Sequence, residues 1–133
     1  MYEYYMNADH AHKQHPDGFT YNLPDGLYKE EGLELGLSEL HIRFKDPTVL
    51  CFNICCNIIG PSYVNGDTIP ILRRVHMTTG RHSSHLIFNP VVFKPIVQPW
   101  ISGIRVYLRD VKSPSSSFEL ETLECTLQIQ QQS

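Results

Sequence analysis

The chain has 133 residues, of which 41% are hydrophobic, and a formal net charge of −3. This length fits one domain with one core, and the hydrophobic content excludes a chain that is disordered throughout. The mild negative charge and the lack of a basic stripe argue against direct binding to nucleic acid or to an anionic membrane surface. No apolar stretch reaches the roughly 18 residues that a membrane-spanning helix needs.

Residues 1–17 are polar and contain tyrosines, histidines and a proline, and we expect them to form a flexible N-terminal arm. They carry neither a basic region nor an apolar run, so no signal peptide is expected. Residues 18–130 form the single predicted domain, and 131–133 are a polar tail. The first strand of the domain is expected to begin at Phe19 and to end at a turn at residues 24–26.

Residues 33–44 alternate leucines with other residues, but the alternation slips by one position at residues 38–39. An extra residue in one strand, a β-bulge, produces such a slip. A helix is the competing interpretation of this segment. Leu35 falls outside the apolar stripe of that helix, and Gly36 weakens a helix further. We therefore predict a bulged strand.

Residues 49–59 form the clearest strand pattern in the chain, with two distinct faces. One face carries Leu50, Phe52, Ile54, Cys56 and Ile58, and the other carries Val49, Cys51, Asn53, Cys55 and Asn57. Residues 60–68 are expected to form a loop. Further strands are expected within residues 69–77, 85–88, 91–97, 104–109 and 123–129.

About eight short strands separated by regular turn signals are typical of an all-β sandwich or barrel. Eight strands in two packed sheets is the jelly-roll arrangement, so we predict a single jelly-roll sandwich of about eight antiparallel strands. An immunoglobulin-type sandwich is the main rival, but Trp100 does not lie between cysteines at the required spacing. In jelly-roll order we expect one end of the sandwich to hold residues 24–32, 60–68, 89–90 and 111–118, and the other end 45–48, 78–83 and 99–102.

Seven histidines raise the question of a metal site. Five of them cluster, in the arm at His10, His12 and His15 and in a turn at His82 and His85. A zinc site needs ligands that an ordered backbone holds in place, and a flexible arm does not supply that. We therefore predict solvated surface histidines and no metal or other cofactor.

The cysteines and the serines also lack a recognisable catalytic pattern. Cys51, Cys55 and Cys56 do not form paired C-x₂-C motifs, so we interpret them as small apolar side chains in thiol form. Asp67, Ser84 (or Ser83) and His85 include the residue types of a hydrolase triad, but no G-x-S-x-G motif accompanies them. We expect that the chain is not an enzyme.

Arg73 and Arg74 interrupt an apolar strand, so the period-two rule directs one of them inward or toward a partner. Two interpretations remain open for this pair. The charge lies in solvent at the end of the barrel, or it forms an ion pair between subunits.

Several segments, in the order in which they occur, resemble the penton, or minor capsid, proteins of Polinton/Maverick elements, adintoviruses and virophages. The strongest block is 49–75, the second is 88–110, and a weaker one joins 19–24 with 33–40. Within the strongest block the similar stretches are Cys51-Phe52-Asn53-Ile54-Cys55, Val64-Asn65-Gly66-Asp67 and Pro70-Ile71-Leu72-Arg73. After Asp110 the chain departs from the family, which usually continues with a glycine-containing turn and a different final strand.

The resemblance implies a jelly-roll subunit that forms a homopentamer at the fivefold vertices of an icosahedral virion and contacts double jelly-roll major capsid proteins. The expected location is the capsid, assembled inside the host cell. The alternative is a non-enzymatic jelly-roll module that binds carbohydrate or another ligand, for which Trp100 and Tyr107 are the candidate aromatic residues. The expected subunit interface comprises Tyr2, Tyr4, Tyr5, Gly66, Asp67, Arg73, Arg74, Arg109 and Asp110.

Overall fold

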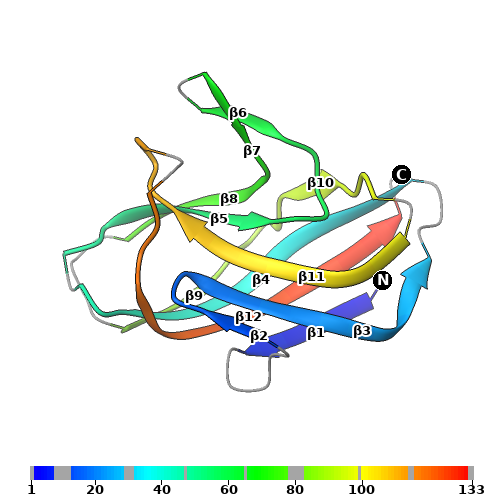
Figure 1. The fold of residues 1–133 in the computed structure, drawn as a ribbon, viewed down its shortest axis with the longest axis horizontal. Helices are drawn as coiled ribbons and strands as arrows, with labels where there is room; N and C mark the ends of the chain where they lie inside the picture. The colour runs from blue at the N-terminus through cyan, green and yellow to red at the C-terminus, as the bar shows by residue number, and fades with distance from the viewer. Residues whose placement is uncertain are drawn as a thin grey trace.

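The computed structural model describes residues 2–7, 13–28, 32–46, 48–64, 66–77, 83–98, 100–113 and 116–131. Its secondary structure consists of twelve strands. They form antiparallel sheets, two of which have five strands each and face one another (Figure 1). The all-β sandwich that the sequence predicts is therefore confirmed.

The first sheet has the strand order β1-β12-β4-β10, and β9 also pairs with β4. The bounds are β1 (Tyr2–Asn7), β4 (Leu33–Phe44), β9 (Ser83–Ile87), β10 (Phe93–Pro95) and β12 (Leu120–Gln131). Both β9 and β10 lie along the same edge of β4, one after the other. β10 lies opposite residues 34–36, and β9 lies opposite residues 39–43.

The second sheet has the strand order β2-β3-β11-β5-β8. The bounds are β2 (Lys13–His15), β3 (Gly18–Tyr28), β5 (Cys51–Cys56), β8 (Ile71–His76) and β11 (Trp100–Arg109). A separate hairpin of β6 (Ser62–Val64) and β7 (Asp67–Ile69) packs on the outside of this sheet, and its tip projects from the molecule (Figure 1). The sequence predicts a loop here, and the hairpin replaces that loop.

The strand pairs are nested along the chain. β1 pairs with β12, β3 with β11, β4 with β9 and β10, and β5 with β8. Such a set of pairs describes one long hairpin that is folded over on itself. Pairing of β12 with β4 and of β11 with β5 then joins the pairs into two sheets.

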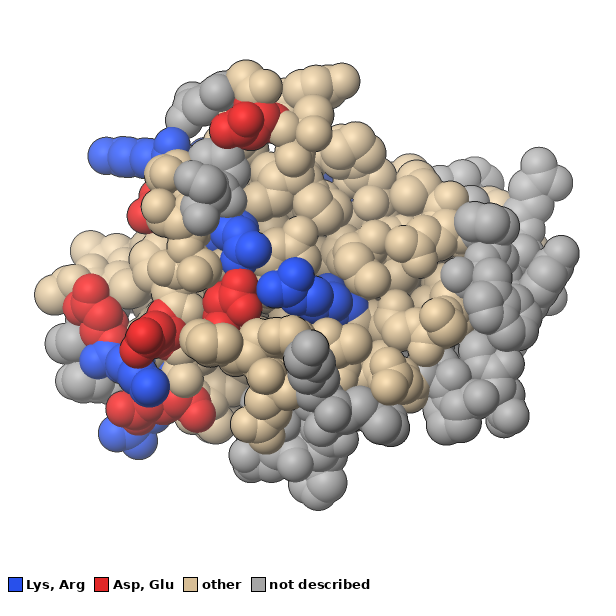
Figure 2. Space-filling view, in the orientation of Figure 1, with Lys and Arg blue, Asp and Glu red and all other residues tan. Residues whose placement is uncertain are grey.

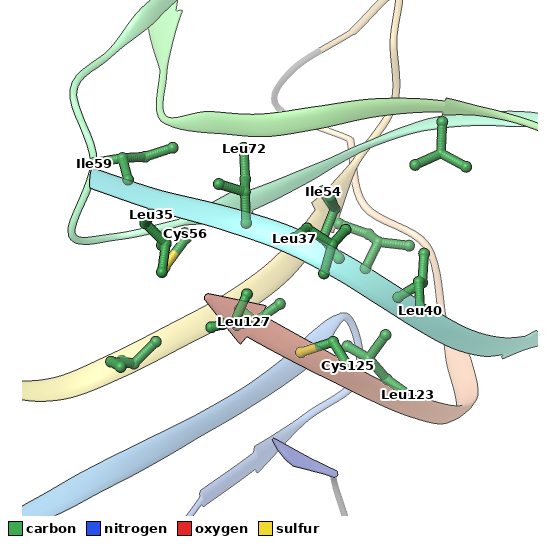
Figure 3. Packing of buried hydrophobic residues seen from close by; sticks show 14 of the residues in the cluster. Leu35, Leu37, Leu40, Ile54, Cys56, Ile59, Leu72, Leu123, Cys125 and Leu127 are labelled. Atoms are coloured by element: carbon green, nitrogen blue, oxygen red, sulfur yellow. The ribbon is translucent and has the colours of Figure 1, made fainter. Parts of the chain in front are cut away.

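The core is the apolar layer between the two sheets. From the first sheet, Leu35, Leu37 and Leu127 point into this layer, and Ile54 and Cys56 point into it from the second (Figure 3). All five are at most 1% exposed. The inward face predicted for residues 49–59 is thus confirmed for its central positions, whereas Leu50 at its start is 47% exposed.

The bulge predicted near residue 38 is confirmed. Thr126 of β12 lies opposite Glu39, while the next residue, Leu127, lies opposite Leu37. Ser38 is therefore the extra residue, and its Oγ donates a hydrogen bond to the Thr126 carbonyl oxygen at 3.2 Å. The bulge keeps leucines inward on both sides of the slip, which a regular strand would not do.

The turn predicted at residues 24–26 is wrong. β3 continues to Tyr28, and Ile101 of β11 pairs with Leu27 while Gly103 pairs with Asn22. Only Ser102 lies between those two residues of β11, so four residues of β3 bulge out opposite one. The turn-forming sequence is accommodated as an irregularity in the ladder, because pairing resumes on its far side.

Two further expectations differ from the structure. Tyr2–Asn7 and Lys13–His15 of the expected arm are strands at the edges of the two sheets. The connection 111–118 lies at the same end as 45–48, since Lys45 N donates a hydrogen bond to Glu119 O at 3.2 Å. The start of β11 lies at the same end as the end of β3, because Trp100 pairs with Tyr28, whereas residues 99–102 were expected at the end opposite to 24–32. Both differences arise from long-range pairing that local turn signals do not reveal.

A substitution at Gly18 tests the close approach of β3 to β11. An added Cβ at this position would lie 2.0 Å from the Val106 carbonyl oxygen, which belongs to the backbone and cannot move aside. Gly18→Ala is therefore expected to lower the free energy of unfolding in urea by about 2–3 kcal/mol. Gly60→Ala is the matched control, because its added Cβ would meet only Val97 Cγ1 at 3.4 Å. Equal stability of the two variants would contradict this account.

Candidate interaction surface

The β6–β7 hairpin covers part of the outer face of the second sheet. Val64 and Ile69 pack on Cys55 and form a small apolar cluster apart from the main core. Tyr63 precedes Val64 on β6, so its side chain points to the opposite face of the hairpin, and it is 83% exposed. The hairpin therefore contacts the sheet through two apolar side chains and presents a large aromatic side chain outward.

Two of the expected interface residues lie at the turn of this hairpin. Gly66 has a φ of +85°, a conformation that favours glycine, and Asp67 begins β7. Both residues are exposed. Their position is compatible with a contact to another chain, and the interface role stays a prediction.

An ionic cluster occupies the middle of the same face. Arg109 Nη1 donates a hydrogen bond to Asp17 Oδ2, and Arg105 Nη2 lies 3.6 Å from Asp17 Oδ1. Tyr107 lies between the two arginines, whose guanidinium carbons are 4.6 Å and 4.5 Å from its ring centroid. Figure 2 shows acidic and basic side chains meeting near the middle of this view. Burial raises the pKa of the Tyr107 phenol, so the ring stays neutral.

Arg109 and Asp110, which the sequence assigns to an interface, thus interact within the chain. Arg109 is held by Asp17, whose residue exposure is only 7%. Asp110 Oδ1 accepts hydrogen bonds from the backbone N–H groups of Lys112 and Ser113, at 2.8 Å and 3.3 Å. These contacts stabilise the turn after β11 and leave both residues less available to a partner. The buried Asp17 was missed, because residues 1–17 read as a polar arm.

Arg73 and Arg74 on β8 have different environments. The guanidinium of Arg73 lies 4.2 Å from the centroid of the Phe88 ring, and its Nη1 donates a long hydrogen bond to Pro90 O at 3.5 Å. Arg74 is exposed and pairs across the ladder with Asn53 of β5. The structure thus separates the two arginines, with Arg73 packed against Phe88 and Arg74 open to solvent.

A groove of about 410 Å³ lies beside Arg74. The hairpin, β8 and the segment around β10 border it. Asn53 contributes to its floor and is 0% exposed, and both polar atoms of its amide lack a hydrogen-bond partner among the described residues. We call this site the basic groove. Its lining residues are Asn53, Tyr63, Val64, Ile71, Leu72, Arg73, Arg74, Val92 and Lys94.

Tyr2, Tyr4 and Tyr5 belong to β1, at the edge of the other sheet. The strand register places them opposite Ile129, Leu127 and Thr126 of β12. The structure therefore does not bring the tyrosines together with the hairpin or with β8. The nine expected interface residues are distributed over both sheets and do not form one patch.

Two histidines and two glutamates meet on the outer face of the first sheet. His85 Nε2 contacts Glu39 Oε1, and His41 Nδ1 lies 3.6 Å from Glu124 Oε2. The rings of His41 and His85 are 5.8 Å apart between centroids. Together with Cys125 and Thr126 these residues line a shallow pocket of about 220 Å³. The sequence gives no direct signal for this cluster, because its members come from three separate strands.

The structure does not assemble the hypothetical triad. Asp67 lies in the β6–β7 hairpin, whereas His85 lies in β9 of the first sheet and contacts Glu39. No set of three or more histidine, cysteine, aspartate or glutamate residues within the described ranges is arranged to hold a metal ion. His10, His12 and His82 lie outside the described residues.

The cysteine interpretation is confirmed where burial is complete. Cys55 lies in the small outer cluster and Cys56 in the main core, on opposite faces of β5, and all four cysteines are unpaired. Burial raises the pKa of both thiols to about 12. Burial also raises the pKa of Cys125. These thiols are therefore neutral at physiological pH and are not nucleophiles.

Comparison of the chain with protein-family models, with curated proteins and with solved structures gave no match. Within the described residues, no helix is both long and apolar enough to span a membrane.

Asp17→Asn tests the ionic cluster. The substitution removes one negative charge and leaves Arg109, whose side chain is 20% exposed, without its carboxylate. We expect the free energy of unfolding in urea to fall by about 2–3 kcal/mol. Glu121→Gln is the control, because its pair with Arg43 is about half exposed and should contribute less than about 1 kcal/mol. A smaller effect for Asp17 than for Glu121 would rule out the proposed role.

Thiol accessibility tests the burial of the cysteines. A thiol-specific reagent at about pH 8 should modify Cys51 rapidly and the other three cysteines only after unfolding, because buried neutral thiols react slowly. The raised pKa values also predict a loss of stability as the pH rises above the ordinary value of 9.0, where the unfolded chain releases these protons. Rapid modification of all four thiols in the folded chain would show that the packing is wrong.

Proposed function

We propose that the chain is a structural coat-protein subunit that assembles through repeated contacts with copies of itself. More specifically, we propose a penton, or minor capsid, subunit of the Polinton/Maverick, adintovirus and virophage type. Such a subunit forms homopentamers at icosahedral fivefold vertices and contacts the major capsid protein. Its place of action would be the virion.

The nested strand pairing is the observation that carries this proposal. Counted along the chain, with β9 and β10 taken as one strand and β2, β6 and β7 left out, eight strands remain. When these eight strands are renumbered 1 to 8 in chain order, the first sheet (β1-β12-β4-β9/β10) has the order 1-8-3-6. The second sheet (β3-β11-β5-β8) has the order 2-7-4-5. Two interleaved Greek keys of eight strands give a jelly roll, which is a recurrent capsid fold. The fold alone does not define a function, so the sequence resemblance supplies the specific part of the proposal.

The placement of the similar segments supports the proposal. The block 49–75 contains β5, the hairpin and β8, and the block 88–110 contains β10 and β11. β8, β5 and β11 are adjacent in one sheet, so segments from both blocks form a continuous part of the sandwich. If this chain and the penton family share a fold, the similar segments are expected to be neighbours in space.

A closed ring requires two different patches on each subunit, because each copy contacts one neighbour on either side. The hairpin tip at Gly66 and Asp67 remains available for one patch. The edge strand β1, with Tyr2, Tyr4 and Tyr5, is a candidate for the second. These sets lie on different sheets, which is the separation that a ring contact needs.

The alternative function as a carbohydrate-binding module is less well supported. Trp100 and Tyr107 lie seven positions apart on β11, which corresponds to about 23 Å along a strand. Tyr107 is also enclosed between Arg105 and Arg109. The two aromatic residues therefore do not form one platform for a sugar ring.

The oligomeric state tests the proposal. Native mass spectrometry over a concentration series should show a species five times the 15.3 kDa mass of the chain, and negative-stain images should show rings. Asp67→Lys at the hairpin tip should shift the equilibrium toward monomer. Glu119→Lys carries the same charge change at an exposed site before β12 and should leave the ring intact. A chain that stays monomeric at every concentration would exclude the vertex role.

A further inference from the structure

The basic groove is lined by several positively charged residues, and the packing of the sandwich does not require positive charge at this place. Of the described residues that line it, three are cationic, Arg73, Arg74 and Lys94, and none is acidic. Among the described residues, no ion pair involves Arg74 or Lys94. The chain as a whole has a net charge of −3, so the groove is opposite in sign to the rest of the molecule. This charge favours an acidic ligand.

Asn53 adds a second, independent observation. It lies in the floor of the groove, is fully buried, and has neither an acceptor for its Nδ2 nor a donor for its Oδ1 in the described part of the chain. Buried polar groups in proteins nearly always have a partner, so an unpartnered amide at this place needs an explanation. A carboxamide offers N–H donors and a C=O acceptor side by side, so it can bind a polar side chain such as a carboxyl group or a carboxamide.

The edge of the second sheet supplies a third observation. β8 is the last strand in its sheet, and only β5 pairs with it among the described strands. Alternate N–H and C=O groups of an edge strand point away from the sheet and are available to an added strand. Addition of an extended peptide to such an edge is a common mode of recognition.

We propose that the basic groove binds an acidic, extended segment of another protein chain, which lies along β8 and directs its carboxylates to Arg74 and Lys94. One of its side chains would approach Asn53 across the outer face of β8, after a small outward movement of the β6–β7 hairpin. That movement disturbs the cluster of Val64 and Ile69 on Cys55, against which Ile71 and Tyr107 also pack. The proposal does not depend on the ring, because it concerns a site on the single chain.

The walls of the groove favour a peptide over a phosphate group. Val64, Ile71 and Val92 line it together with the exposed Tyr63. Aliphatic and aromatic walls suit the side chains of an extended peptide, whereas nucleic-acid backbones are recognised by basic stripes that follow successive phosphates. Protection of a sheet edge by arginines would explain Arg73 and Arg74 alone, but it would leave the unpartnered amide of Asn53 unexplained.

The test is fluorescence anisotropy with two labelled peptides that have blocked ends. One alternates valine with glutamate, and the other alternates valine with glutamine. The acidic peptide is expected to bind at least tenfold more tightly than the neutral one, with an affinity that falls as salt is added. Equal binding of the two peptides, or no binding of either, would refute the proposal.

Matched variants locate the site. The double variant Arg74→Glu with Lys94→Glu should reduce binding of the acidic peptide to the level of the neutral one. Lys112→Glu changes the charge in the same direction outside the groove and should bind as the original chain does. The milder pair Arg74→Gln with Lys94→Gln gives the same test if the charge reversals do not fold. Unchanged binding by a folded double variant would place the peptide elsewhere and overturn the assignment.

Asn53→Leu separates the peptide site from a general anion site. Leucine keeps the branched shape of the side chain, with slightly more volume, but offers no hydrogen bond, so the variant should fold and bind the acidic peptide several-fold more weakly. Competition with inorganic phosphate provides the opposing outcome. If phosphate displaces the acidic peptide at similar concentrations, the groove is an anion site and the peptide proposal fails. A monomer that binds the acidic peptide would support this site while rejecting the ring, so the two proposals fail separately.

Discussion

The apolar layer between the two sheets is the constraint on which the rest of the structure depends. Successive side chains of a strand point to opposite faces, so each residue committed to this layer determines what its neighbours can do. Leu35 and Leu37 enter the layer from β4, and Leu127 and Ile129 enter it from β12. The residues between them must face outward. The outer surfaces therefore carry whatever chemistry the chain has.

The two outer faces differ in character. On the second sheet, Asp17 holds two arginines around Tyr107, and the hairpin covers a small apolar cluster beside them. The first sheet instead presents two histidines and two glutamates on adjacent strands. A subunit with two unlike faces has the asymmetry that head-to-tail association requires.

The sequence predicts those parts of the structure that follow from period-two burial. The sandwich follows from the apolar alternation itself, and the bulge at Ser38 follows from a one-residue shift in it. Cys55 and Cys56 lie on opposite faces because they are adjacent in a strand. What it does not predict depends on a distant partner. β1 has little apolar pattern of its own, and its pairing with β12 makes it a strand.

The candidate sites were less predictable than the fold for the same reason. The segment around Asp17 is polar, and nothing in it indicates that Asp17 will be buried beside Arg109, which lies far away in the chain. Asn53 occupies the outward face of a strand, where a polar residue usually meets water. In the described part of the chain, Tyr63 and Val64 of the hairpin, which the sequence presents as a loop, line the groove that contains Asn53. Which side chains meet at the surface therefore depends on the pairing of distant strands, and the local sequence pattern does not predict it.

The divided edge of the first sheet has a consequence for the behaviour of the chain at high concentration. β9 and β10 share one side of β4, and each is short, with five and three residues. Long, flat outer strands act as templates on which further molecules add in register, and short interrupted ones do not. The break at residues 88–92 thus limits unordered sheet growth along this margin. Ordered contacts would then be left to the hairpin and to the opposite margin, where β1 lies.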